Sequence, residues 1–512
     1  MATSGPIAKR HISKVTKIQS FIKHRIHGVK ELCCMKNVIL HKFLTPMVLL
    51  IIVSTVAAGC ATQEGTVQQT IDPQEAQQVA YDATVYGFPL VIMDLTRQVL
   101  TAVPAPNANG APVNQFGNKK TFPDATFTNV VNPNADTLYS SAWVDTAKEP
   151  IILSVPDTQG RYYLMPMLNL WTDVFGSPGS RTTGTGAGNF AITGPDWSGN
   201  LPDGITEMKS STRWVWIVGR IACTGPSDYE AVWKLQDQLK LTPLSAWGTN
   251  YVPPTNVPVD QGVNIKVSPL NQLLTLDAAN YFNYICQLMV DNLPYEADAP
   301  LLANLANIGI KTGADYKSYF AGLDDGVKSA IQTGYQSALA KIPTANMGNS
   351  KNGWQMVYDT GDYGTNYMFR AAIAYRGLGA NLIDDAFYAS ASAGSDGAKF
   401  SSDDKYVIHF NKDEIPPVNG FWSITMYNDK ILFAANPINR YCLGSLSDPP
   451  LIKNLDGSID IYIQRDSPDS AKMPNWLPTP ASGDFSLTIR LYWPQEAVLD
   501  KTWVPPAVQL VE

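Results

Sequence analysis

The stretch Asn132-Pro-Asn-Ala-Asp-Thr-Leu-Tyr139 begins the region around which this chain is organised. Two apolar segments that read as buried strands follow it, and the region runs on through Arg161, Trp171 and Arg181 to Thr182. Loops that carry polar and aromatic residues between rigid strands are a common place for binding and catalytic groups. We therefore expect one wall of any functional site between residues 132 and 182.

Short apolar runs bounded by turn-forming residues predict β-strands on both sides of this stretch. In the first half they cover residues 138–144, 151–155, 162–168 and 214–223. Residues 485–493 alternate cleanly, with Arg490 and Tyr492 on one face and leucine and isoleucine on the other, which predicts a half-buried antiparallel strand. Ile459, Ile461 and Ile463 alternate in the same way. Short strands joined by long loops favour a sandwich or a jelly roll.

Helices are expected before and between these strands. Asp72-Pro73-Gln74-Glu75 has the residue types of a helix start, and Pro89 should kink or end that helix, with a second segment over residues 90–100. Further along, apolar residues recur at helical spacing over residues 278–289 and 327–342. These patterns predict an N-terminal helical segment and a helical insertion between two sheet domains.

Charge is divided unevenly along the chain. Of the 512 residues, the first 59 carry nine Lys and Arg and one acid, Glu31, so the net charge of this end is +8. The whole chain has a net charge of −7, so residues 60–512 carry about −15. Binding to a nucleic acid backbone depends on clustered Lys and Arg. We therefore expect no nucleic acid partner.

The basic N-terminal end is typical of a secretion signal. A basic segment from Met35 precedes an apolar run over residues 47–58 and small residues before Cys60, and Val56-Ala-Ala-Gly-Cys60 resembles a bacterial lipoprotein signal. Residues 1–34 then form an upstream extension, and Cys60 is the expected lipidation site. Ala61 after the cysteine favours the outer membrane, on its periplasmic side. The alternative is a transmembrane anchor, but the run is shorter than the roughly 20 residues that span a bilayer.

Cysteine and histidine are scarce after Cys60. The remaining cysteines, Cys223, Cys286 and Cys442, are far apart, and His409 is the one histidine of the body. Soft-metal sites need clusters of these residues, so we predict no metal site, no cofactor and a metal-independent activity, if there is one. A calcium site built from oxygen ligands remains open at the acidic pairs Asp324-Asp325 and Asp403-Asp404.

Several motifs in order resemble a known pairing of bacterial domains. They are Asn134-Ala-Asp-Thr-Leu-Tyr139, Gly160-Arg-Tyr162, Gly194-Pro-Asp-Trp197, Phe421-Trp-Ser-Ile-Thr-Met-Tyr427, Asn436-Pro-Ile-Asn-Arg-Tyr441, Asn475-Trp-Leu-Pro478, Arg490-Leu-Tyr-Trp-Pro494 and Trp503-Val-Pro-Pro506. Together they resemble domain of unknown function 1254 followed by domain of unknown function 1214, over most of residues 75–510. The resemblance implies two jelly-roll-like sheet domains and no settled activity. Ala135 stands where the usual motif has arginine.

The predicted fold class is therefore α+β, mainly β, with two jelly-roll-like antiparallel β-sandwich domains, an N-terminal helical segment and a helical insertion. The expected divisions are an extension and signal peptide over residues 1–59, a tether over 60–71, the first helices and sandwich over 72–255, the insertion over 256–350 and the second sandwich over 351–512.

Two function classes remain open. The first is an envelope hydrolase acting on a glycan or a similar polar substrate, with Asp136 and Tyr139 as catalytic residues. Its substrate-binding residues would be Asn134, Arg161, Trp171, Arg181, Arg440, Arg490 and Tyr492, with Tyr139 and Trp171 as stacking surfaces. The second is a non-catalytic envelope protein, anchored to the membrane by lipid, that binds a ligand or has a structural role. In that case the side chains of Asn134 and Asp136 only form hydrogen bonds to the nearby backbone of their turn.

We also predict that both halves of the chain contribute to one site. The first sheet domain would supply Asn134, Asp136, Tyr139 and Arg181, and the second would supply Arg440, Arg490 and Tyr492. Ligand sites favour clefts between domains, where polar groups of separate elements converge. An arginine near Asp136 should keep its carboxylate ionised.

Overall fold

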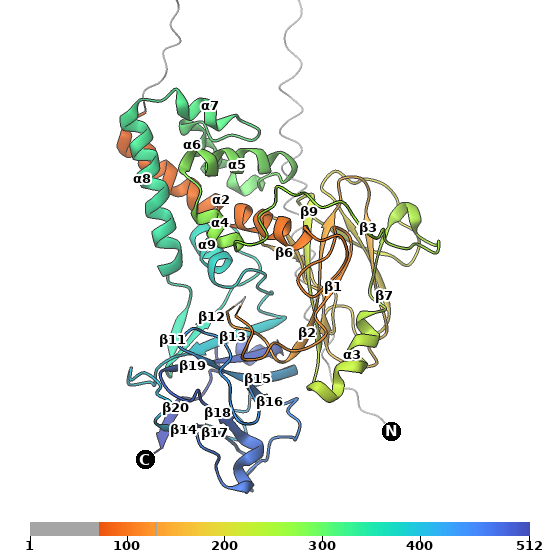
Figure 1. The fold of residues 1–512 in the computed structure, drawn as a ribbon, viewed down its shortest axis with the longest axis vertical. Helices are drawn as coiled ribbons and strands as arrows, with labels where there is room; N and C mark the ends of the chain where they lie inside the picture. Colours follow the sequence, from red (N-terminus) through yellow and green to blue (C-terminus); the bar gives the residue numbers. More distant parts are fainter. Residues whose placement is uncertain (1–70, 129–130, 512) are drawn as a thin grey trace, which may run out of the picture. The chain divides into compact units, whose positions relative to one another are not determined.

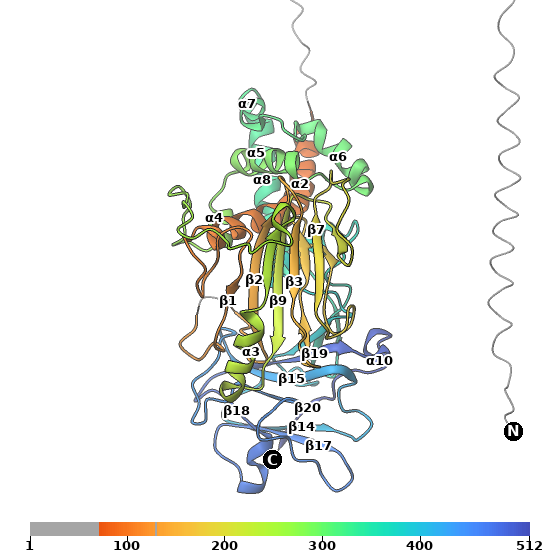
Figure 2. The same ribbon diagram turned by 90° about the vertical axis from the view of Figure 1, so that its right-hand side faces the viewer.

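The computed structural model describes residues 71–128 and 131–511, which Figures 1 and 2 show as ribbons. The expected signal peptide, Cys60 and nearly all of the tether lie outside the described residues.

The first described element is the helix α2 (Pro73–Thr101), which begins where the sequence predicts. Asp72 is its N-cap, and its Oδ2 accepts hydrogen bonds from the backbone N–H groups of Gln74 (2.9 Å) and Glu75 (3.2 Å). The expected helix end at Pro89 is wrong, because α2 continues through this residue to Thr101. Phe88 and Leu90 on either side of Pro89 are fully buried, so tertiary packing outweighs the local cost of the proline.

Six further helices follow or surround α2. They are α4 (Pro269–Leu274), α5 (Ala278–Asp291), α6 (Ala299–Leu305), α7 (Tyr316–Ala321), α8 (Asp325–Lys341) and α9 (Tyr367–Arg376). In Figure 1 they gather around α2, and the helices α2 and α8 approach so closely that a Cβ atom at Gly334 would lie 2.1 Å from the Gln77 carbonyl oxygen. The apolar faces of this helical layer also pack on Trp143 and Trp216 of the N-terminal sheets.

The N-terminal half contains two sheets. The six-stranded sheet has the order β1 (Gly117–Asn118), β2 (Thr137–Asp145), β9 (Trp214–Ala222), β5 (Met167–Asn169), β6 (Val174–Gly176), with β4 (Tyr163–Leu164) also pairing with β9. The four-stranded sheet has the order β10 (Lys240–Pro243), β3 (Ile151–Val155), β7 (Gly188–Thr193), β8 (Thr206–Lys209). The helix α3 (Tyr229–Gln236) contributes Val232 to the core between them. The strand expected over residues 162–168 is split in two at Met165-Pro166, since proline has no N–H for the ladder.

The C-terminal half repeats the pairing of a six-stranded and a four-stranded sheet. The larger sheet has the order β11 (Asn349–Lys351), β12 (Trp354–Val357), β13 (Ala386–Ala391), β19 (Phe485–Pro494), β15 (Val418–Asn428), β16 (Cys442–Gly444). The smaller one has the order β18 (Trp476–Pro478), β17 (Ile459–Gln464), β14 (Lys405–Phe410), β20 (Val508–Val511). The short helix α10 (Glu496–Leu499) follows β19. Ile408, Ile461 and Ile489 are fully buried between the two sheets.

The α+β, mainly β fold class is confirmed. The described strands are antiparallel except for the parallel pairs β7–β8 and β17–β18, and this strand order does not establish a jelly roll. Among the described residues, no helix combines the length and the apolar character that crossing a membrane requires.

The strand β19 differs from its expected half-buried character. Its alternation is as predicted, with Leu487, Ile489 and Leu491 in the core between the C-terminal sheets. The opposite face is buried as well, because Arg490 and Tyr492 are 4% and 0% exposed. They lie against the turn that begins the organising stretch of the N-terminal half, as the hydrogen bonds below show.

Candidate functional site

The turn at Asn134 joins the two halves of the chain. The Asn134 Oδ1 atom accepts hydrogen bonds from the backbone N–H groups of Asp136 (2.7 Å) and Thr137 (3.0 Å), which is the local turn chemistry expected of asparagine. Its Nδ2 donates to the Tyr492 hydroxyl on β19 (2.6 Å), and the Tyr427 hydroxyl on β15 donates to the Pro133 carbonyl (2.7 Å). The turn is therefore fixed both internally and to the C-terminal sheet.

Asp136 is buried where the halves meet, with 5% of its surface exposed. The Ser423 hydroxyl on β15 donates to its Oδ2 (2.7 Å). Burial raises the pKa of Asp136, while Arg490 and the Ser423 hydrogen bond act in the opposite direction. The expected arginine, Arg490, does favour the ionised carboxylate, but desolvation is the larger influence and the net shift of the pKa is upward.

Arg490 is held by neutral groups of both halves. Its Nη1 donates to the Thr425 hydroxyl (2.6 Å), and its Nη2 donates to the Tyr427 hydroxyl (2.6 Å) and to the Asn132 carbonyl (3.3 Å). No carboxylate of the described residues lies within 4.0 Å of its guanidinium nitrogens.

A second buried arginine, Arg220, was missed by the sequence analysis. It is the cross-strand neighbour of Tyr139 in the β2–β9 pair, and its Cζ lies 5.1 Å from the centre of the Tyr139 ring. Its Nη1 donates to the Val218 carbonyl and to Asn381 Oδ1 (2.8 Å each), and Nη2 donates to the Gly379 carbonyl (3.3 Å). The signal for it was a lone charged residue inside the apolar run 214–223.

Tyr388 completes the arrangement from the C-terminal side. It is the cross-strand neighbour of Arg490 in the β13–β19 pair, and its hydroxyl accepts a hydrogen bond from Asn381 Nδ2 (3.0 Å). Electrostatic interactions link Arg220 to Tyr139, Tyr388 and Tyr492. We call these residues of both halves the inner cluster: Asn134, Asp136, Tyr139, Arg220, Tyr388, Arg490 and Tyr492.

The inner cluster therefore brings together five of the sequence-predicted site residues. Two of the other four form ion pairs. Arg181 Nε lies 2.6 Å from Asp385 Oδ1, a fully buried carboxylate of the C-terminal half that also accepts from the Ser177 hydroxyl (2.5 Å). Arg161 donates two hydrogen bonds, of 2.6 and 2.7 Å, to the Asp228 carboxylate.

Trp171 and Arg440 have structural surroundings. Trp171 is fully buried against the Tyr86 ring, with 4.8 Å between ring centres, so it offers no surface on which a ligand could stack. Arg440 Nη1 donates to the carbonyls of Met473 (2.7 Å) and Trp476 (2.9 Å), so it binds the 3-10 helix Ser470–Asn475 and the start of β18.

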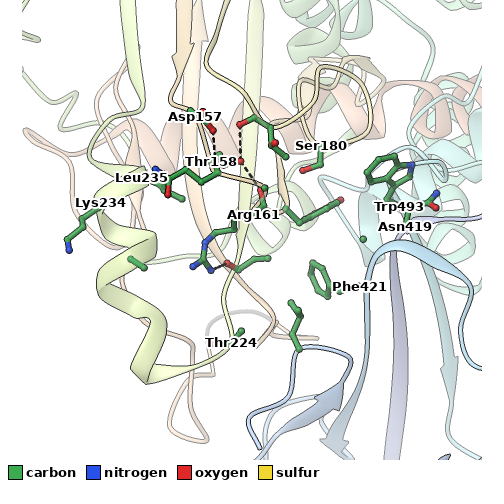
Figure 3. Close-up of a pocket in the computed structure, with 18 of the residues that line it drawn as sticks. Asp157, Thr158, Arg161, Ser180, Thr224, Lys234, Leu235, Asn419, Phe421 and Trp493 are labelled. Atoms are coloured by element: carbon green, nitrogen blue, oxygen red, sulfur yellow. Dashed lines mark hydrogen bonds between the residues drawn. The ribbon is translucent and has the colours of Figure 1, made fainter. Parts of the chain in front are cut away.

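A cleft of about 960 Å³ lies between the halves, beside the inner cluster. Figure 3 shows Lys234 and Leu235 of α3 on one side of it, and Asn419, Phe421 and Trp493 of the C-terminal half on the other. We call this space the outer cleft. The Tyr162 ring lines it and also packs edge-on against the Tyr492 ring, with 5.9 Å between centres, so Tyr162 separates the outer cleft from the inner cluster.

Trp493 has an unusual backbone at the rim of the outer cleft. Its φ is +51°, a left-handed conformation that is rare for a large side chain. The Trp493 N–H donates to the Asp385 carbonyl (2.8 Å), and the Tyr162 hydroxyl donates to the same oxygen (3.3 Å). Asp385 thus holds two aromatic walls of the cleft, while its side chain binds Arg181.

Among residues 71–128 and 131–511, no three His, Cys, Asp or Glu side chains gather as metal ligands would. The His409 ring lies near the surface, with Nδ1 2.6 Å from Asp460 Oδ1, and this hydrogen bond is the main cause of its raised pKa.

Comparison with known families accounts for both halves of the chain. The family described as "Protein of unknown function (DUF1254)" matches residues 113–243, and the family "Protein of unknown function (DUF1214)" matches residues 385–496. The chain therefore pairs a DUF1254 domain with a DUF1214 domain, as its motifs predict. No curated protein matches it.

One solved structure shares the fold. The VPA0106 protein from Vibrio parahaemolyticus is similar over 85% of this chain and all of its own, with 24% sequence identity and a TM-score of 0.63. An uncharacterized protein from Burkholderia cenocepacia aligns over 83% of this chain and 87% of its own, with 14% identity and a TM-score of 0.42. The first likeness shows that the two-domain fold occurs as a whole in another bacterial protein.

Proposed function

We propose that this protein is a non-catalytic envelope lipoprotein that binds a small polar ligand, such as a glycan fragment, in the outer cleft. The observation that carries the proposal is the position of Trp493. Its left-handed backbone lies at the rim of a cleft formed by both halves. Such conformations cost on the order of 1–3 kcal/mol and cluster at ligand sites, where the surrounding structure holds them.

The lining of the cleft supports a ligand with both polar and apolar faces. Tyr162 and Trp493 supply half-buried aromatic rings, and Lys234, Gln238 and Asn419 supply hydrogen-bonding groups. Ligand sites combine such apolar walls with a few polar groups that fix orientation. Sugars have this character, because their C–H faces stack on aromatic rings while their hydroxyls need hydrogen-bonding partners.

The carboxylates favour binding over hydrolysis. Glycoside cleavage generally needs two carboxyl groups about 5 to 10 Å apart. Asp157 is the one carboxylate among the described residues that line the cleft, and its Oδ1 accepts from the Gln159 N–H (2.7 Å) within a turn. Asp136, the expected catalytic acid or base, lies buried in the inner cluster, where the Ser423 hydroxyl donates to its Oδ2, and it does not line the cleft.

A titration with oligosaccharides tests the proposal. We expect neutral or acidic glycan fragments to change the tryptophan fluorescence of the protein saturably. Trp493→Ala should weaken this binding at least roughly tenfold, since aromatic anchors carry much of the energy of such sites. Trp197→Ala is the matched control, because Trp197 is also half-buried but does not line the cleft.

Two results would contradict the proposal. One is equal affinity of the Trp493→Ala and Trp197→Ala variants for every bound glycan. The other is release of reducing ends from a glycan by the wild-type protein and not by a folded Asp136→Asn variant, which would make the protein a hydrolase.

The proposed anchoring rests on the sequence around Cys60, which is outside the described residues. Cleavage before Cys60 and lipid attachment to it would hold the protein on the outer membrane. Cys60→Ser should release the protein from the membrane fraction. An unmodified Cys60 in the intact mass of the mature wild-type protein would refute the anchor.

A further inference from the structure

We propose that the inner cluster is a second binding site, which takes an oxyanion: the carboxylate or phosphate group of a small ligand. This site is independent of the proposed glycan binding in the outer cleft. The two are separated by the Tyr162 ring and have different chemistry, since the outer cleft is lined by aromatic and mixed polar groups and the inner cluster by hydrogen-bond donors.

The first argument is the balance of charge. Arg220 and Arg490 are 5% and 4% exposed, and neither has a carboxylate within 4.0 Å among the described residues. Asp136 is the carboxylate that acts electrostatically on Arg490, so the inner cluster holds two cations against one acid. Buried charges in proteins are normally paired, because an isolated one loses its hydration without compensation. An oxyanion bound beside Arg220 would supply the missing charge.

The second argument is a surplus of hydrogen-bond donors. The Nε atom of Arg220 is buried and has no partner among the described residues. The hydroxyls of Tyr388 and Tyr492 each accept from an asparagine Nδ2, which leaves both O–H protons free to donate.

The orientation of both asparagines is fixed by their other partners. Asn381 Oδ1 accepts from Arg220, and Asn134 Oδ1 accepts from two backbone N–H groups. Neither amide can therefore turn its oxygen toward a tyrosine hydroxyl without losing these bonds. Donors with no acceptor, next to a buried cation, form the kind of surface that recognises oxyanions.

The third argument is access. Tyr139 and Tyr388 are only half-buried although they lie between the halves, and Asn134 beside Tyr492 is half-buried too. Space the size of a water molecule therefore adjoins these three members of the inner cluster. A guanidinium group can hold a carboxylate or a phosphate in a forked geometry, and Arg220 would present its Nε edge to the anion.

Calorimetric titration of the full chain with sodium phosphate and, separately, sodium acetate tests the site, with sodium chloride at equal ionic strength as the reference. We expect saturable binding of one or both oxyanions. The two probes distinguish a phosphate-bearing from a carboxylate-bearing ligand. Arg220→Gln should weaken the binding at least roughly tenfold, since it removes the charge and the fork. Arg220→Lys, which keeps the charge without the fork, should fall between that variant and the wild-type protein.

Arg213→Gln is the matched control. Arg213 directly precedes β9, the strand that carries Arg220, but it already pairs with Asp145 and Asp291 (2.7 Å each). Its removal should leave anion binding unchanged. If Arg220→Gln does not fold, Tyr388→Phe serves in its place, because it keeps the ring and removes one donor, and it should weaken binding severalfold.

The proposal is overturned if neither phosphate nor acetate binds saturably at millimolar concentrations. It is equally overturned if the folded Arg220 or Tyr388 variants bind the anion as tightly as Arg213→Gln does.

Discussion

Two buried arginines, Arg370 and Arg220, have the same chemistry and opposite surroundings. They are 1% and 5% exposed, and among the described residues Nε and Nη1 of Arg370 and Nε of Arg220 have no hydrogen-bond partner. Arg370 on α9 nevertheless has a carboxylate nearby, with Nη2 3.3 Å from Asp173 Oδ2, whereas the groups around Arg220 are carbonyls, an amide and the Tyr139 side chain. The fold supplies Arg370 with a carboxylate of its own, whereas the charge of Arg220 is left for the proposed oxyanion to neutralise.

The region around Arg370 pairs its acids with hydrogen-bond donors. Asp173 accepts from the Tyr295 hydroxyl (2.7 Å) and from the Tyr363 N–H (3.2 Å). Nearby, Asp298 accepts from the hydroxyls of Tyr86 (3.0 Å) and Tyr367 (2.8 Å). Tyrosines here donate to acids, while Tyr388 and Tyr492 of the inner cluster accept from amides and keep their protons. The same residue types therefore stabilise the packing around Arg370 and leave hydrogen-bond donors unused in the inner cluster.

The largest expected effect compares the two arginines directly. Arg370→Gln should lower the free energy of unfolding by about 3 to 5 kcal/mol, because it leaves Asp173 buried without its cation. Arg220→Gln should cost less, about 1 to 3 kcal/mol, because only neutral partners lose a hydrogen bond. Urea unfolding followed by circular dichroism measures both. The comparison breaks if Arg220→Gln is as costly as Arg370→Gln, since Arg220 would then have an acid partner of its own.

A smaller effect compares two tyrosines. Tyr367→Phe removes a hydrogen bond to the Asp298 carboxylate and should cost roughly 1.5 to 3 kcal/mol, whereas Tyr388→Phe removes one from a neutral amide and should cost roughly 0.5 to 1.5 kcal/mol. Both keep the aromatic ring, so the two variants are matched in volume. The same unfolding assay decides, and a reversed order would show that the Tyr388 proton already has a charged acceptor.

The smallest expected effect is a pH dependence at Asp136. Burial raises its folded pKa above the ordinary value, so the folded state binds more protons than the unfolded chain in the interval between the two. Its contribution to stability is therefore fully present at acid pH and is lost as pH rises through the folded pKa. Asp136→Asn should remove this pH-dependent loss of stability. The free energy of unfolding of the variant should therefore rise relative to that of the wild type as pH rises from about 4 to 8.

Asp228 provides a control of opposite sign. Burial acts to raise its pKa, but the hydrogen bonds from Arg161 prevail and lower it. Asp228→Asn should therefore lose stability relative to wild type as pH rises from the acid range. Parallel stability curves for Asp136→Asn and wild type would contradict the buried, desolvated state of Asp136.

The sequence predicts best what depends on neighbours along the chain. The start of α2 is set by Asp72 and Pro73, and the alternation of β19 by its own side chains, so both are confirmed. The continuation of α2 through Pro89 and the burial of Arg490 and Tyr492 depend on elements far away in sequence, which periodicity does not report.

The inner cluster illustrates the same limit. We expected Asn134 to approach Tyr492 because ligand sites favour clefts between domains, and the two side chains form a direct hydrogen bond. Arg220 and Tyr388 could not be chosen, because each sits alone in an apolar strand and only the register of two strand pairs puts them beside Tyr139 and Arg490. Arg161 and Arg181 stand in the same loop-rich stretch as the turn, yet their acids lie at Asp228 and Asp385, which no local pattern indicates.

The close contact between α2 and α8 also concerns the order of synthesis. The ribosome synthesises α2 first, and α8 begins at Asp325, more than 200 residues after α2 ends at Thr101. At about 5 to 20 residues per second, roughly 10 to 45 s of translation separate the two. During that time the apolar face of α2 has no α8 to cover it. The N-terminal half thus cannot finish folding while it is being made, and a nascent chain stopped before residue 325 should depend on a chaperone to stay in solution.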